Sequence, residues 1–336
     1  MSSPAAQAKT TPKPEGRLRS WTRKHGFQVS VLVPVLSLGF IFVYGFIAYS
    51  GRVSISRWQG ILPNLKVADP WYSVYDKLIH TARFQADLRN IFIFTALLLL
   101  FAILLGLALA LLIHNALVAS GFFRTVFLLP YALSFIVTGV VWRWIFTPST
   151  GANAILKHVG IDPGPKWITD PTVAGDVSAA LEKVIPGADF IQIKMGIPLA
   201  IIPVVIAASW QLGGFAMANF LAALGTIPPE LHEAASLDGA STMQYYRKVV
   251  LPLLRPAVMV VVVLLGHIAL KSFDLVYAMV GQGPGFATDV PGLFVFDTMF
   301  RAGKYNTGAA ASIVMFVLVA IVVLPYLHRN FVKEEK

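Results

Sequence analysis

Long apolar runs, each about the length of a bilayer-spanning helix, alternate along the chain with more polar segments. A helix needs about 20 apolar residues to cross a hydrocarbon core roughly 30 Å thick. Six runs reach this length, at approximately 29–49, 91–113, 126–146, 197–224, 257–277 and 309–327. The pattern predicts an all-α polytopic membrane protein with six transmembrane helices.

The first run could also be a signal peptide, because Ala48 and Ser50 resemble a small-residue cleavage site after a basic leader. Its apolar stretch is longer than the roughly 7–15 residues of a signal-peptide core. We therefore interpret residues 27–50 as a retained first transmembrane helix. With six spans, both termini lie on the same side of the membrane.

Basic residues predict which side that is. Residues 1–26 carry one acid, Glu15, and six lysines or arginines: Lys9, Lys13, Arg17, Arg19, Arg23 and Lys24. Positive charge next to a span marks the cytoplasmic side. We expect both tails, 1–26 and 331–336, to be cytoplasmic and the chain to lie among the lipids of a bacterial inner membrane. Segments 51–90 and 147–196 then form an outer, periplasmic lobe and an outer insertion.

Composition narrows the chemistry that the chain can perform. Of its 336 residues, 56% are hydrophobic and 13% charged, against about a quarter charged in soluble domains, which excludes a water-soluble enzyme. The net charge of +10 is explained by basic residues that flank spans, so nucleic acid is not an expected partner. No cysteine is present and the seven histidines lack metal-ligand spacing. We predict neither a metal site nor an enzyme.

The connection between the fourth and fifth spans, at 225–256, is unusually long and amphipathic. Pro228 and Pro229 suit the first turn of a short helix, and Gly239 can leave that helix with a positive φ. Ser241 can cap a second helix that stops at Pro252. The loop is therefore predicted to form a helix, a turn and a second helix on the cytoplasmic face.

Several residues of this loop follow the pattern of one family of transport proteins: Glu233, Ala234, Ala235, Asp238, Gly239, Leu251 and Pro252. Their order and spacing resemble the EAA loop of the permease subunits of bacterial binding-protein-dependent ABC importers. Segments 131–144 and 266–275 look closest to permeases for glucose, mannose or α-glucosides, within the maltose-type class. The resemblance implies a permease core at 91–330. Segment 172–196 looks like an insertion.

The resemblance implies an ATP-driven sugar importer in which this chain forms half of the translocation pathway. Its partners would be a second, non-identical permease subunit, two ABC ATPase subunits and an extracytoplasmic sugar-binding protein. ATP and Mg²⁺ would bind the ATPase, so no cofactor is expected in this chain. The seven loop residues would couple the pathway to the ATPase. A helix lying on lipid is the alternative, but Glu230, Glu233 and Asp238 do not suit a lipid surface.

Polar residues inside spans are costly in hydrocarbon and usually face a bundle interior or a cavity. Two groups are candidates for the sugar path: Gln211, Phe215 and Asn219 on the fourth span, and His267, Lys271, Ser272 and Asp274 on the fifth. Sugar hydroxyls need donors and acceptors, while sugar C–H faces stack on aromatic rings. Hydrogen bonding between helices, or snorkelling of Lys271, is the alternative interpretation.

Two other transporter classes stay open. An ion-coupled secondary transporter could also use six helices with a histidine, a lysine and an aspartate, and an ABC permease could carry a solute other than sugar. The EAA-like loop favours an ABC importer, because a secondary transporter needs no element that docks an ATPase.

Overall fold

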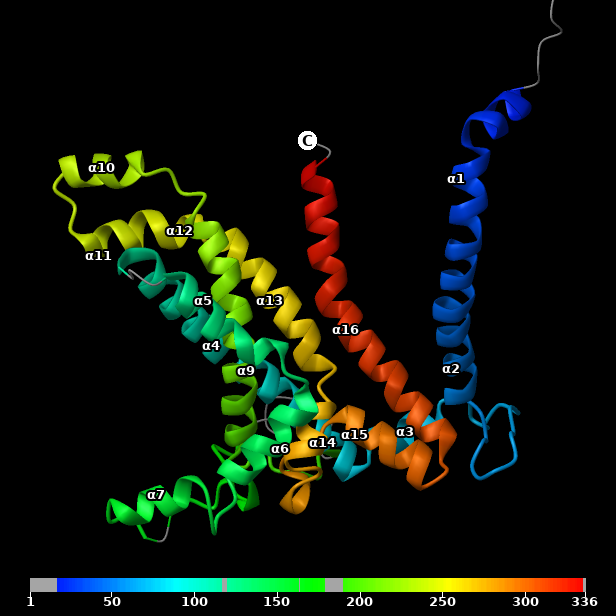
Figure 1. The fold of residues 1–336 in the computed structure, drawn as a ribbon. Helices are drawn as coiled ribbons and strands as arrows, with labels where there is room; N and C mark the ends of the chain where they lie inside the picture. The colour runs from blue at the N-terminus through cyan, green and yellow to red at the C-terminus, as the bar shows by residue number, and fades with distance from the viewer. Residues whose placement is uncertain (1–16, 117–119, 163, 179–189, 335–336) are drawn as a thin grey trace, which may run out of the picture. The chain divides into compact units, whose positions relative to one another are not determined.

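The computed structural model describes residues 17–116, 120–162, 164–178 and 190–334 (Figure 1). The chain divides into two compact units, at 1–51 and 52–336. The first consists of α1 (Arg17–Gly39), a π-helical turn η1 (Phe40–Gly45) and most of α2 (Phe46–Ser54). The helix begins earlier than the predicted residue 27, and residues 1–16 of the predicted basic tail lie outside the described residues.

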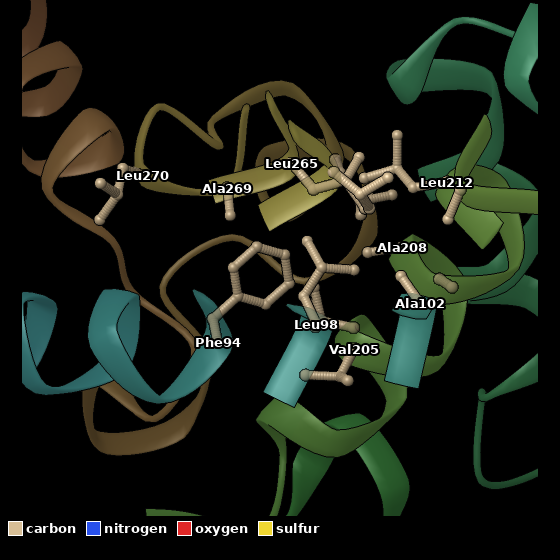
Figure 2. Packing of buried hydrophobic residues seen from close by; sticks show 14 of the residues in the cluster. Phe94, Leu98, Ala102, Val205, Ala208, Leu212, Leu265, Ala269 and Leu270 are labelled. Carbon is tan, nitrogen blue, oxygen red and sulfur yellow. The ribbon is translucent and has the colours of Figure 1, made fainter. Parts of the chain in front are cut away.

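Helices α4 (Ala82–Ala116) and α9 (Ile201–Leu224) pack closely against each other at the centre of the second unit. Small residues permit the approach, since a Cβ atom on Gly106 would lie 2.5 Å from the Cβ of Ala216. Helix α13 (Arg255–Leu270) completes the core. Figure 2 shows the buried side chains that meet there, among them Phe94, Leu98, Val205, Leu212, Leu265 and Ala269. Packing through small residues is typical of membrane helices. Lipid tails are as apolar as the side chains of another helix, so helices associate through close van der Waals contact, which small residues allow.

The third predicted span, 126–146, is not a single helix. It is broken into α5 (Ser120–Leu128), a 3₁₀ turn η2 (Leu129–Ala132) and α6 (Phe135–Ile145), and the two parts are bent by 96°. Ser134 starts α6 by accepting a hydrogen bond from the Val137 N–H at 3.2 Å. A proline in η2 and this N-cap both favour a break, so the prediction of a continuous helix is wrong.

The fifth predicted span, 257–277, is also interrupted. Helix α13 ends at Leu270, and a separate short helix, α14 (Asp274–Met279), follows. Before α13, the segment Thr242–Leu253 is bent from it by 58°. This segment contains α11 (Thr242–Tyr245), π-helical η5 (Tyr246–Val250) and α12 (Leu251–Leu253). The predicted stop at Pro252 is therefore wrong: Pro252 lies in the first turn of α12, where its missing N–H is tolerated, and the bend follows at Leu254.

Four helices in the described part of the chain are long and apolar enough to cross a membrane: Ser30–Ser54, Ala82–Asn115, Ile201–Leu224 and Tyr305–Pro325. Up to six spans result if each of the two bent pairs is one span. The predicted number of six is the upper end of this range.

Short elements connect the spans: α3 (Ser73–Ile79), α7 (Ala152–His158), η3 (Trp167–Thr169), η6 (Pro284–Phe286), α15 (Pro291–Phe296) and η7 (Asp297–Arg301). Helices α3 and α15 pack on α16 (Tyr305–Glu334) (Figure 1). The predicted insertion at 172–196 is closed at its base by β1 (Val173–Ala174), which pairs antiparallel with β2 (Ile197–Pro198). Residues 179–189 of that insertion are outside the described part.

Candidate functional site

The loop between α9 and α13 forms the predicted helix, turn and helix. Helix α10 (Glu230–Leu237) begins after Pro228-Pro229, and Gly239 beyond its end has a φ of +73°. A residue with a side chain is strained at this φ, so glycine suits the position. The Ser241 side chain accepts from the Gln244 N–H at 3.3 Å, and the Gln244 side chain accepts from the Ser241 N–H at 2.9 Å. This reciprocal capping box fixes the start of α11.

Helix α10 has little cover from the rest of the chain. Leu237 is 89% exposed, and Met243, beyond the turn, is 75% exposed. Glu233 and Ala234 are exposed as well, and Ala235 is half-buried. Among the described residues, Glu233 makes no ion pair. Acidic and apolar side chains displayed together on one short helix are typical of a surface that another protein covers.

Side chains tie this loop to the ends of the long core helices. A cavity of about 560 Å³ lies beneath α10, between the ends of α4 and α9 and the start of η5. Across it, the Tyr246 hydroxyl donates to Asn115 Oδ1 at 2.5 Å. The ring centroids of His232 and Tyr245 are 4.8 Å apart. Side-chain contacts thus join α10 to α11 and η5 to the end of α4.

Leu251 and Pro252 lie at the other end of the loop, in α12. Leu251 is exposed and Pro252 half-buried, while Leu254 at the bend is 1% exposed. The seven predicted coupling residues therefore share one continuous loop. Those near Gly239 form its exposed tip, and these two connect it to α13.

The first group of predicted path residues braces the broken span. Gln211 is 1% exposed, and its Nε2 donates to the backbone carbonyl of Leu133 at 2.8 Å. The ring of Phe215 stacks on that of Tyr131 with centroids 5.1 Å apart. Asn219 Nδ2 donates to the Phe215 carbonyl at 2.8 Å. Gln211 and Phe215 both contact the segment between α5 and α6, so the interhelical interpretation describes them best.

The second group contributes to a cavity. His267 and Lys271 line a space of about 600 Å³ between α13, α15, η7 and α16. The other polar lining residue is Ser312, and four aromatic rings complete much of the wall: Phe273, Phe296, Phe300 and Phe316. Neither Ser272 nor Asp274 lines this space, because the chain leaves α13 at Leu270 and turns into α14.

An ionic network near the start of α4 was not predicted. Arg83 Nε donates to Asp289 Oδ2 at 2.6 Å, and its Nη2 donates to Asp297 Oδ2 at 2.7 Å. Gln282 Nε2 donates to the same Asp297 oxygen at 2.6 Å. Arg301 Nη1 lies 3.0 Å from Asp297 Oδ1. The network joins α4 to η7 and to the segment before α15.

The pKa values of the two acids in this network, Asp289 and Asp297, are shifted in opposite directions. Burial raises the pKa of Asp289 above its ordinary value, and the nearby Arg83 only partly offsets this. Burial also opposes ionisation of Asp297, but hydrogen bonds from Arg83 and Gln282 outweigh it, so the pKa of Asp297 is lowered. Asn90 Nδ2 also donates to the Asp289 backbone carbonyl, at 2.8 Å. Arg83 and Asn90 are seven residues apart and so lie on one face of α4, which was a usable sequence signal. Their partners some 200 residues away gave none.

Two further features concern clusters of ligating side chains and the glycine-rich segment after α14. No group of three or more histidine, aspartate or glutamate side chains there could hold a metal ion. The glycine-rich segment after α14 is a turn, with a φ of +66° at both Gly281 and Gly283.

Residues 102–335 match the family described as binding-protein-dependent transport system inner membrane component. The chain is 32% identical over 307 residues to a probable ABC transporter permease protein of Pyrococcus horikoshii, covering 91% of this chain and 96% of the relative. It is 29% identical to the xylose/arabinose import permease protein XacH of Haloferax volcanii, covering 87% and 84%. It is 28% identical to the trehalose/maltose transport system permease protein MalF of Thermococcus litoralis, covering 89% and 88%.

A solved structure has the same fold. It is the crystal structure of a bacterial ABC transporter involved in the import of the acidic polysaccharide alginate, with a TM-score of 0.74 and 21% identity over 94% of this chain and 98% of that chain. The resemblance drawn from the EAA-like loop and the all-α membrane fold are thereby confirmed. Permeases of this kind are transport components and not enzymes. The chain belongs to the family of binding-protein-dependent transport system inner membrane components, the permeases of ABC transporters.

Proposed function

We propose that this chain is the permease subunit of an ATP-driven carbohydrate importer and forms half of its translocation pathway. The observation that carries the proposal is α10, a short, exposed, acidic helix with an exposed leucine at its end. A helix of this kind suits insertion into a cleft of an ATPase subunit, in the mode of a helix in a groove. ATP and Mg²⁺ bind that partner. Glu233 faces a basic group there, and Ala234, Ala235 and Gly239 allow close approach.

Carbohydrate as the solute is supported by relatives and by the lining of one cavity. XacH and MalF are named for xylose/arabinose and trehalose/maltose. The cavity beside α13 combines two nitrogen-bearing side chains, His267 and Lys271, with four phenylalanine rings. A few polar groups in an aromatic wall suit sugar, because hydroxyls bind donors and acceptors while C–H faces stack on rings. A second, non-identical permease completes the wall.

The orientation and remaining partners follow from the same proposal. The basic leader supports a cytoplasmic N-terminus, and with six spans the C-terminus and α10 share that side. Two ATPase subunits then bind beneath the loop. A solute-binding protein delivers the sugar on the outer side, where the insertion at 172–196 and the ionic network of Arg83 lie.

The test is a charge reversal on α10. Glu233→Lys replaces attraction by repulsion at the ATPase contact, so we expect recruitment of the ATPase to weaken by about tenfold or more. Sugar-stimulated ATP hydrolysis and uptake should fall with it. The complex would be purified from native membranes with its co-purifying chains, reconstituted in liposomes, and assayed for bound ATPase and for uptake of labelled glucose, maltose and xylose.

Asp162→Lys is the matched control, because Asp162 is an exposed acid on the outer side whose pair with Lys157 spans 3.3 Å. It should leave recruitment and uptake unchanged. Wild-type recruitment and uptake in Glu233→Lys would contradict the role of α10. Uptake that proceeds without ATP but stops when the ion gradient is dissipated would instead support an ion-coupled transporter. ATP-driven uptake of other solutes, with no response to sugars, would contradict the carbohydrate assignment.

A further inference from the structure

A cavity lined by charged and polar side chains lies between α3, η7 and the start of α16. We call it the cationic cavity. It is distinct from the aromatic cavity beside α13. Its volume is about 610 Å³, which is in the range of small-molecule sites. The charged side chains that line it are Lys77, Arg83, Asp297, Arg301 and Lys304. Four cationic groups thus share the space with one carboxylate.

The positive charge is only partly compensated. Arg83 is held by Asp289 and Asp297, and Asp297 also contacts Arg301. Within the described ranges, the ammonium groups of Lys77 and Lys304 make no ion pair. The Arg301 side chain is 58% exposed and keeps donors free for a ligand. The cavity therefore offers two unpaired ammonium groups and part of a guanidinium.

Neutral polar groups surround these charges. Gln59, Thr81, Gln282, Thr298 and Thr307 bring amide and hydroxyl groups to the wall. Cationic groups bind carboxylate through charge-assisted hydrogen bonds, which are stronger than neutral ones. Amides and hydroxyls match the alternating donors and acceptors of a polyhydroxylated ring. A bare inorganic anion would use the cations and leave most of these groups without a ligand contact.

We infer that the cationic cavity binds a sugar acid, that is, a sugar ring that bears hydroxyl groups and one carboxylate. The carboxylate lies between Lys77, Lys304 and Arg301, and the hydroxyls face the threonine and glutamine side chains. The cavity is separate from the aromatic one, because Phe296 and Phe300 line the latter while Asp297 and Arg301 line the former. The inference concerns binding at this face alone and does not depend on which sugar is transported.

The experiment measures equilibrium binding to the purified complex in phosphatidylcholine nanodiscs, without ATP. The probes are D-galacturonate, D-galactose and inorganic phosphate. We expect galacturonate to bind and galactose to bind much more weakly, with an affinity for galacturonate that falls as salt rises. Lys77→Gln and Lys304→Gln should each weaken galacturonate binding by roughly tenfold. Lys66→Gln, an exposed lysine of the same outer lobe that does not line the cavity, should leave it unchanged.

Four results would overturn the inference. If galacturonate binding survived both lysine substitutions, the binding site would lie elsewhere. If galactose bound equally well, the carboxylate of the ligand would not contribute to binding. Phosphate binding as tight as galacturonate would reduce the cavity to a general anion site. Loss of galacturonate binding in nanodiscs that contain phosphatidylglycerol would assign the cavity to a lipid headgroup. None of these results bears on ATP-driven uptake, which tests the proposed function separately.

Discussion

At the scale of the residue, Gln211 shows how a buried polar side chain can hydrogen-bond to a backbone carbonyl where a helix is interrupted. Leu133 lies between η2 and α6, outside both helices. The Gln211 amide donates to its carbonyl at 2.8 Å from the neighbouring helix α9. A buried carbonyl left without a donor costs about 1–3 kcal/mol. The residue predicted to bind sugar is thus placed to stabilise the 96° bend.

Gln211→Leu should therefore lower stability more than it changes transport. The substitution keeps the volume but removes the donor, so we expect a loss of about 1–3 kcal/mol, measured as a lower midpoint of thermal unfolding in detergent. Asn219→Leu is the control, because among the described residues the Asn219 side chain bonds only to the carbonyl of Phe215 in its own helix, and it should cost less. An unchanged midpoint together with altered sugar selectivity would restore Gln211 to the path.

A second prediction concerns the contact between α9 and α5. A Cβ atom on Gly214 would overlap the carbonyl oxygen of Phe127, which is backbone and cannot rotate away. Gly214→Ala should destabilise the fold by about 1–3 kcal/mol or more, seen again as a lower unfolding midpoint. Gly225→Ala is the matched control, since its new Cβ would find no atom nearer than 3.5 Å. Equal midpoints for the two variants would show that α5 is free to shift.

At the scale of the element, the network of Arg83 fastens η7 to the start of α4. Its two acids respond to pH in opposite directions. Asp297 has a lowered pKa, so it contributes stability above its unfolded value near 3.8, and this is lost as pH falls through the lower folded pKa. Asp289 has a raised pKa, so its contribution is present at low pH and is lost as pH rises through the folded value.

Asp297→Asn should accordingly lower the unfolding midpoint at pH 7, by a few degrees for roughly 1 kcal/mol. The gap between wild type and variant should then narrow as pH is lowered below about 4, because wild-type Asp297 becomes protonated too. Unfolding scans at a series of pH values would measure this gap. Asp162→Asn, at an exposed pair, should show almost no gap at any pH. A difference in midpoint that widens on acidification would contradict a lowered pKa of Asp297 in the folded protein.

Elements set by local signals were predictable, and those set by distant contacts were not. Pro229, Gly239 and Ser241 start or end helices through local backbone geometry and hydrogen bonds to residues close in sequence. The helix, turn and helix around α10 could therefore be predicted from the sequence. The break at η2 combines local signals, Pro130 and the Ser134 N-cap, with a distant contact from α9, where Gln211 donates to the Leu133 carbonyl. Apolar composition alone could not distinguish this broken segment from a straight span, because α5 and α6 are both predominantly apolar.

At the scale of the whole molecule, the apolar runs predicted the class of protein correctly, and the EAA-like loop predicted the family. The candidate site was predicted less completely. His267 and Lys271 were assigned to a cavity because they are polar in an apolar run, and they line one. The phenylalanines that share it come from α15, η7 and α16 as well, and no spacing along the chain indicates that these elements meet.

The segment formed by α15 and η7 is one wall with two chemically opposite faces. Phe296 and Phe300 border the aromatic cavity, while Asp297 and Arg301 border the cationic one. A shift of this wall that enlarges one cavity must therefore change the other. If an occupant of one side alters the affinity of the other by some factor, thermodynamic linkage requires the same factor in return. Residues 296–301, at the junction of α15 and η7, would then couple the binding of two ligands that do not contact each other.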